Sequence, residues 1–133
     1  MLAIKARITK GLNFGALVPT CDNSGAKVIK VYGRKRSKTV KGRMGSAGVG
    51  DLVMASVVKG KPEMRKQTVL AIIVRQKKEY RRLDGTHIKF EDNAAVIVKD
   101  EKGNPKGTIL KGAVAKEAAE RWVNLSKIAK IIV

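Results

Sequence analysis

The sequence is poor in the residues from which disulfides, metal centres and catalytic sites are commonly built. Its 133 residues include one cysteine, Cys21, and one histidine, His87. A single cysteine excludes an internal disulfide and any zinc site with several cysteine ligands. It also suits a reducing cytosol. No cluster of metal-ligand residues is visible in the sequence, so we predict no metal and no cofactor.

Aromatic residues and long apolar runs are also scarce. Aromatics make up 4% of the chain, which argues against a surface built mainly to stack single-stranded bases. No apolar run approaches the roughly 20 residues that span a bilayer. Charges interrupt the apolar residues of Met1–Gly15, so this segment lacks the continuous apolar region of a secretory signal. We therefore expect a cytoplasmic protein without a membrane partner.

Acidic residues are few, and basic residues are abundant. There are 29 Lys and Arg against 11 Asp and Glu, which gives a net charge of +18. Such a charge repels itself in a compact fold unless a polyanion neutralises it. Nucleic acid is the leading candidate and an anionic membrane surface is the second; we predict nucleic acid as the partner. With 44% hydrophobic residues, the chain is too apolar for a disordered basic tail.

One stretch, Thr68–Val98, organises the rest of the chain. Val69–Val74 is an unbroken apolar run rich in β-branched residues, typical of a strand buried on both faces. Basic residues follow, and then Asp84-Gly85, a strong hairpin signal because glycine takes a positive φ without strain. Ala94–Val98 is apolar again. The pattern predicts a long hairpin with a buried base and a projecting cationic tip.

Other segments predict further strands followed by two short helices. Residues 16–18 and 27–32 form a predicted antiparallel pair, and 51–58 and 107–114 are predicted strands. Glu63–Gln67 is expected to form one helical turn. Many short strands with turn signals favour a sandwich or a barrel, and we favour a small barrel because it removes exposed strand edges. We therefore predict a mainly β single domain of residues 1–133, with an arm at 1–13, the barrel at 14–114 and a helical segment at 115–133.

The helical segment has an apolar face. Ala115, Ala118, Ala119 and Trp122 are spaced as one side of a helix. Asn124 is a candidate cap for a second helix. Trp122 either packs on the core or belongs to an exposed patch for a protein partner, and the sequence leaves both interpretations open.

The sequence gives little support to an enzyme. We interpret Cys21 as a small buried hydrophobe rather than a nucleophile, and His87 as a surface residue or a nucleic-acid contact. Asp51, Glu91 and Asp92 lie next to turns, so capping is favoured over a paired-carboxylate site. The glycine-rich segment Gly33–Gly50 lacks the Gly-Lys-Ser/Thr ending of a nucleotide-binding loop. We predict that the protein is not an enzyme.

Basic residues gather in two clusters, Arg34–Arg43 and Arg75–Arg82. One interpretation is a solvated surface. The size of the net charge favours a second, in which the two clusters grip two segments of a nucleic-acid backbone. Arginine binds phosphate bidentately and lysine acts as a point charge, so such contacts position the protein without reading sequence.

Several motifs together resemble one known family. They are Ala71–Val74, Asp84-Gly85, Phe90, Asn93, Val96-Ile97, and the segments CDNSGAK at 21–27, AGVGD at 47–51, KGKPEMRK at 59–66 and KGTILKGAVAKE at 106–117. Nearly the whole chain resembles the large-subunit ribosomal protein L-fourteen family. The arm and KGKPE resemble its archaeal and eukaryotic branch. Leu83 departs from the pattern, because many members have Pro or Lys there.

The resemblance implies a fold and a set of partners. The fold would be a five-stranded β-barrel with a projecting basic ribbon at about 75–90 and short C-terminal helices. The implied role is that of a structural constituent of the cytoplasmic ribosome that binds large-subunit rRNA at the face toward the small subunit. Implied partners are small-subunit rRNA through an inter-subunit bridge, ribosomal proteins L-three and L-twenty-four-e, and an anti-association initiation factor. The alternative is a free-standing RNA-binding regulator or chaperone on a small barrel.

The resemblance also assigns residues. The expected rRNA contacts are Arg34, Lys35, Arg36, Lys38, Lys41, Arg43, Arg65, Lys66, Arg75, Lys77, Lys78, Arg81, Arg82 and Lys89. The expected surface for protein partners and bridges comprises Lys116, Glu120, Arg121, Trp122, Leu125 and Ile128.

Overall fold

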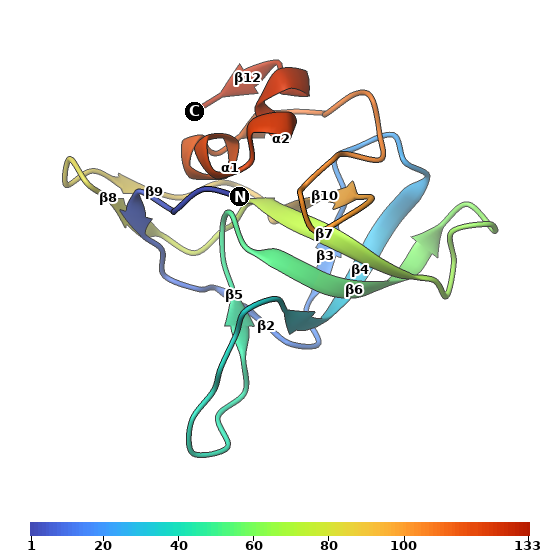
Figure 1. Cartoon of the computed structure of the whole chain (residues 1–133), viewed down its shortest axis with the longest axis horizontal. Coiled ribbons are helices and arrows are strands. Elements are labelled where there is room, and N and C mark those ends of the chain that lie inside the picture. The colour runs from blue at the N-terminus through green and yellow to red at the C-terminus, as the bar shows by residue number, and fades with distance from the viewer.

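A curled antiparallel sheet forms the body of the molecule in the computed structural model, which describes residues 1–133 (Figure 1). Its strand order is β10-β7-β6-β4-β3, and all neighbours are antiparallel. The bounds are β3 (Leu17–Pro19), β4 (Ala26–Arg34), β6 (Leu52–Gly60), β7 (Thr68–Arg75) and β10 (Ala94–Val98). The predicted mainly β class and the β3–β4 pair are confirmed.

The two edges of this sheet approach each other. Thr20, just after β3, forms a bridge with Ala95 in β10, and the Cys21 N–H donates to the Ala95 carbonyl at 3.0 Å. The edges meet at this bridge and not along a continuous ladder. The sheet is therefore strongly curled, and the closed barrel stays a prediction.

Short strands extend from this body. The three-stranded group has β1 (Ala6–Arg7) and β9 (His87–Ile88) on either side of β8 (Tyr80–Arg82). Antiparallel β2 (Leu12–Asn13) and β5 (Ser46–Ala47) form a second group, and parallel β11 (Ala113–Val114) and β12 (Ile131–Ile132) form a third. Figure 1 shows that the β8–β9 hairpin and the loop between β4 and β5 project from the body. The hairpin predicted around Asp84-Gly85 is confirmed.

Strand β7 is buried on both faces, as its apolar run predicts. Ala71 and Ile73 belong to the core inside the curl of the sheet. The alternate residues, Ile72 and Val74, belong to the core beneath the C-terminal helices. Because successive side chains of a strand point to opposite faces, this single strand contributes to both cores.

The helices α1 (Lys116–Arg121) and α2 (Val123–Ile128) cover the second core (Figure 1). Ala118 and Ala119 are buried, as the helical periodicity predicts. Trp122 is also buried, and its indole Nε1–H donates to the Gly50 carbonyl at 2.8 Å. The packing interpretation of Trp122 is therefore correct. No helix of the structure has the length and apolar character to cross a membrane.

Two local predictions are wrong. Asn124 does not cap α2, which begins at Val123, and its amide instead donates to Asn104. The strand predicted for 107–114 is reduced to β11 and an isolated bridge of Leu110 with Asp22, and Gly112 between them has a φ of +78°. Residues 62–66 form a turn in which the Arg65 N–H donates to the Lys61 carbonyl at 3.2 Å, which agrees with the single helical turn expected at Glu63–Gln67.

Candidate nucleic-acid interface

The basic residues expected to contact RNA divide into two groups by burial. The exposed group comprises Arg36, Lys38, Lys41, Arg43, Arg65, Lys66, Lys77, Lys78, Arg81 and Lys89. The half-buried group comprises Arg34, Lys35, Arg75 and Arg82. Every member of the half-buried group forms an ion pair with an acidic side chain, and no member of the exposed group does.

Arg75 is fully engaged within the protein. Its Nε and Nη2 donate to the two carboxylate oxygens of Asp92 at 3.0 and 3.1 Å, and Nη1 donates to the carbonyls of Lys111 and Ala113. A side-on bidentate pair of this kind uses the edge that would otherwise grip a phosphate. Arg75 therefore holds β11 against β7 and has no free edge for RNA.

Arg82 is engaged in the same way. Its Nε lies 2.7 Å from Glu117 Oε1, and its Nη2 donates to the Val133 carbonyl at 2.7 Å. The buried Glu117 carboxylate also accepts the Tyr80 hydroxyl hydrogen at 2.7 Å. Burial, with the neighbouring Glu117, raises the pKa of Tyr80, so the phenol stays a donor. This cluster fastens the β8–β9 hairpin to α1.

The exposed cations lie on the projecting loops. Arg36, Lys38, Lys41 and Arg43 lie in the loop between β4 and β5, which contains no acidic residue. Lys77, Lys78, Arg81 and Lys89 lie in and beside the β8–β9 hairpin, and Arg65 and Lys66 lie in the turn between β6 and β7. The hairpin has a tight turn. Its turn is fixed by Asp84, which accepts the N–H and the hydroxyl of Thr86 at 3.0 and 2.7 Å. These hydrogen bonds lower the pKa of Asp84.

The side chains considered for catalysis have structural surroundings. Cys21 is buried, and burial raises the pKa of its thiol to about 11, so little thiolate exists at neutral pH. His87 Nδ1 lies 2.7 Å from Glu79 on the surface. Asp51 accepts the Gly48 N–H at 2.9 Å, which is the capping role favoured from the sequence. No group of three or more His, Cys, Asp or Glu residues is placed to hold a metal ion.

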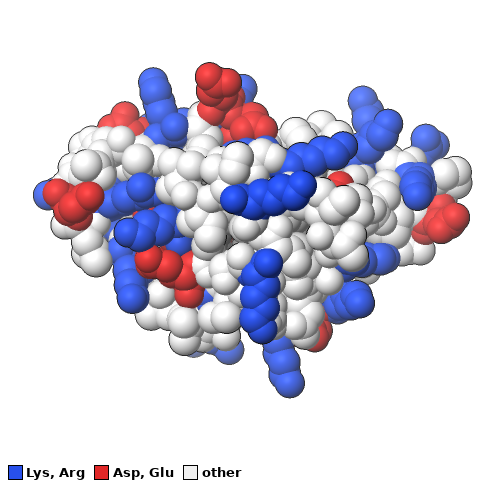
Figure 2. Space-filling view, turned by 90° about the horizontal axis from the view of Figure 1, so that it is seen from above, with Lys and Arg blue, Asp and Glu red and all other residues white.

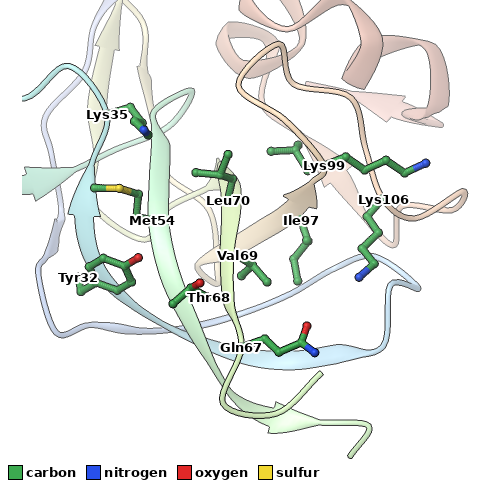
Figure 3. A pocket seen from close by; sticks show the side chains of 11 residues that line it. Tyr32, Lys35, Met54, Gln67, Thr68, Val69, Leu70, Ile97, Lys99 and Lys106 are labelled. Atoms are coloured by element: carbon green, nitrogen blue, oxygen red, sulfur yellow. The ribbon is translucent and has the colours of Figure 1, made fainter. Parts of the chain in front are cut away.

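A groove on the outer face of the sheet contains Lys99 and Lys106, two cations that sequence reasoning missed (Figure 3). It has a volume of about 580 Å³, and its lining includes Tyr32, Lys35, Lys99 and Lys106 but no acidic residue. Figure 2, viewed from above, likewise shows Lys and Arg over much of the surface with fewer acidic side chains among them. The groove residues come from separate strands and from the segment after β10. The only signal in the sequence was that residues on one face of a strand recur at every second position.

The expected protein-facing surface is only partly a surface. Lys116 is exposed, and Glu120, Arg121 and Ile128 are half-buried. Trp122 and Leu125 lie in the core, so they cannot present side chains to a partner, because the apolar stripe of each helix faces the sheet. Sequence reasoning missed the exposed apolar residues of this region, which are Val123, Ile131, Ile132 and Val133.

Comparisons with known proteins agree on one family. The family model described as ribosomal protein L14p/L23e matches residues 11–133. The chain is 54% identical over 133 residues to the large ribosomal subunit protein uL14 of Nanoarchaeum equitans, with both chains fully covered. It is 54% identical over 132 residues to the uL14 of Methanococcus vannielii, with 99% of each covered, and 52% identical over 133 residues to that of Picrophilus torridus, again with both fully covered.

Proposed function

The chain belongs to the ribosomal protein L14p/L23e family, and from this premise we propose that it is a non-enzymatic structural constituent of the large ribosomal subunit. We propose further that it binds large-subunit rRNA through its exposed basic loops. The observation that carries this proposal is the division of the cations: the exposed ones lack acidic partners, whereas each half-buried one forms an ion pair with an acidic side chain.

In the proposed mechanism, the internally paired arginines hold the fold together and the exposed Lys and Arg side chains contact RNA. The internal pairs of Arg75 and Arg82 fix how β11 and the β8–β9 hairpin lie on the body. The curled sheet, which we propose behaves as a barrel, holds the two projecting loops at a fixed separation. The exposed Lys and Arg side chains then neutralise phosphates of separate RNA segments without reading their sequence.

A second surface is proposed to meet proteins and the small subunit. It contains Lys116 and the exposed apolar residues Val123, Ile131, Ile132 and Val133. A contiguous exposed apolar patch is typical of a protein contact, and Ile131, Ile132 and Val133 are consecutive exposed residues. On the family resemblance, the partners are ribosomal proteins L-three and L-twenty-four-e, an anti-association initiation factor, and small-subunit rRNA at an inter-subunit bridge.

Sedimentation of a lysate through sucrose gradients at low and high salt tests the proposal. The chain should stay with the large subunit through a high-salt wash. A variant with glutamine at Lys38, Lys41, Lys77 and Lys78 should wash off at lower salt, because it has lost phosphate contacts. A matched variant that changes the same number of lysines elsewhere should stay bound. A natural chain that runs free at low salt would instead support the free-standing regulator.

A further inference from the structure

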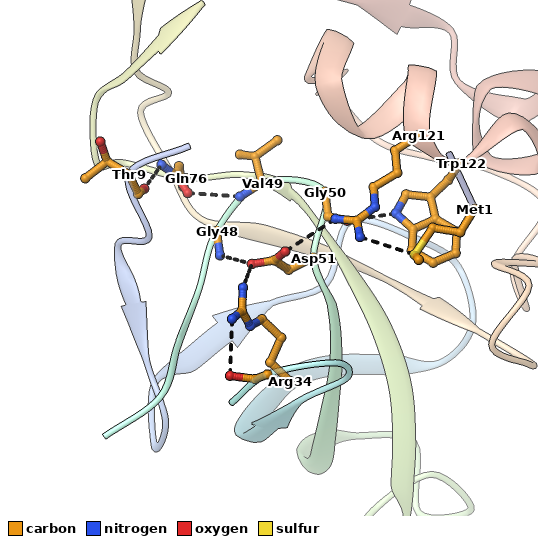
Figure 4. Close-up of polar contacts among 11 residues, drawn as sticks. Met1, Thr9, Arg34, Gly48, Val49, Gly50, Asp51, Gln76, Arg121 and Trp122 are labelled. Carbon is orange, nitrogen blue, oxygen red and sulfur yellow. Dashed lines mark hydrogen bonds and ion pairs between the residues drawn. The ribbon is translucent and has the colours of Figure 1, made fainter. Parts of the chain in front are cut away.

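Two arginines share one carboxylate beside the N-terminal arm (Figure 4). Arg34 Nη1 lies 3.3 Å from Asp51 Oδ2, and Arg121 Nη1 lies 3.5 Å from Asp51 Oδ1. The three side chains are 16%, 17% and 9% exposed, in the order Arg34, Arg121 and Asp51. The cluster therefore carries an excess positive charge that is largely shielded from water.

The donors of these arginines are incompletely used. The Nε atoms of Arg34 and Arg121 are buried and have no hydrogen-bond partner. Arg121 Nη2 has only the thioether sulfur of Met1, at 3.2 Å, and a thioether is a weak acceptor. Buried donors without partners are rare in folded proteins, and each one calls for an explanation such as an ion or water.

Comparison with the other internal arginines shows what is missing. In Arg75 and Arg82 the edge formed by Nε and Nη2 faces a carboxylate. In Arg121 the same edge faces only Met1. Burial, opposed by Asp51 and reinforced by Arg34, lowers the pKa of Arg121, as expected for a cation without enough counter-charge.

A pocket opens at this cluster. Its volume is about 310 Å³, and it is lined by Ile4, Ala6, Ile8, Lys10, Arg34, Asp51 and Arg121. Three cations and one carboxylate thus face a space that the apolar side chains of the arm partly enclose. Low access to water strengthens the attraction between these cations and an anion.

We propose that this pocket binds one phosphate group, held by Lys10 at the rim and by Arg121, whose side chain turns its Nε–Nη2 edge away from Met1 and into the pocket. A phosphate offers several acceptor oxygens and fits a guanidinium edge bidentately. The phosphate comes either from an RNA backbone or from a free phosphate compound. The groove in Figure 3 has no comparable feature, because none of its lining side chains is a buried donor without a partner.

Inorganic phosphate added to the purified full-length chain tests the pocket, with chloride at matched ionic strength as the reference. The arginine Nε–H resonances in NMR spectra should respond, with the Arg121 signal shifting most. Lys10→Gln should weaken phosphate binding several-fold without loss of folding, whereas the matched control Lys127→Gln, an exposed lysine on α2, should not. Arg121→Lys removes the reporting resonance, so its phosphate affinity is measured by calorimetry and should be lost, because an ammonium group cannot bind side-on. An Arg121 signal that phosphate leaves unmoved, or equal losses in Lys10→Gln and Lys127→Gln, would overturn the proposal.

A second experiment identifies the source of the phosphate, and it rests on the proposed rRNA binding. If an RNA backbone supplies it, an rRNA fragment should shift the same Arg121 resonance and should compete with inorganic phosphate. If the fragment binds without competing, the pocket takes free phosphate. If inorganic phosphate does not bind the pocket in the first experiment, the rRNA-binding proposal still stands, because it depends on the exposed loops.

Discussion

The Arg82 guanidinium lies 2.7 Å from the buried Glu117 carboxylate, 35 residues away in the sequence. Arg81, the adjacent residue, is exposed and has no acidic partner. Two neighbouring arginines in one basic cluster therefore have different roles. One fixes the hairpin on the body of the protein, and the other is free to contact an anion.

Replacing Arg82 should destabilise the fold. Arg82→Gln leaves the Glu117 charge buried without its partner, so the free energy of unfolding should fall by about 3–5 kcal/mol. The double variant Arg82→Gln with Glu117→Gln should lose less than the single variant, because no uncompensated charge remains. Chemical denaturation measures both. A double variant less stable than Arg82→Gln alone would contradict the assigned pair.

Replacing Arg81 should affect RNA binding instead. Arg81→Gln should change the free energy of unfolding by no more than about 0.5 kcal/mol, as for most surface substitutions. The slope of log affinity for rRNA against log salt should fall by about 0.7–0.9, the value for one lost phosphate contact. Titrations of an rRNA fragment at several salt concentrations provide the slope. If folded Arg82→Gln lowers the slope as much as Arg81→Gln, the division between scaffold and contact is wrong.

Cys21 should be unreactive and should make stability depend on alkaline pH. Burial raises its pKa from 9.0 to about 11. As pH rises above 9, the unfolded chain loses the thiol proton first, so stability should fall between about pH 9 and 11 by about 2–3 kcal/mol. Below pH 9 the thiol has no effect. Cys21→Ala should lack this difference, and iodoacetamide at pH 8 should label the unfolded chain much faster than the folded one. Equal labelling rates would show that the thiol is accessible.

Local patterns in the sequence predicted the parts of this fold that local chemistry determines. Val69–Val74 had the unbroken apolar character of a strand buried on both faces, and Asp84-Gly85 had the residues typical of a hairpin turn. The sequence could not predict which arginines are neutralised, because Asp92 and Glu117 lie 17 and 35 residues from their partners. The pairing depends on how separate strands and a helix pack together.

The same reason explains the errors in the helical segment. Spacing alone showed that Trp122 and Leu125 lie on the apolar faces of the helical segment. It did not show whether those faces pack against the sheet or against a partner. The exposed β12, at Ile131–Ile132, pairs in parallel with β11, and such a short strand has no recognisable period. The Arg34–Asp51–Arg121 cluster joins three separate elements and left no local signal either.

Lysine reactivity in the free chain and in salt-washed large subunits tests the central claim most directly. An amine-reactive reagent followed by mass spectrometry would report each exposed lysine separately. We expect Lys38, Lys41, Lys77, Lys78 and Lys89 to react in the free chain and to be strongly protected in the subunit, because phosphates surround them there. Lysines of the two projecting loops that react equally in both states would contradict the claim that these loops bind rRNA.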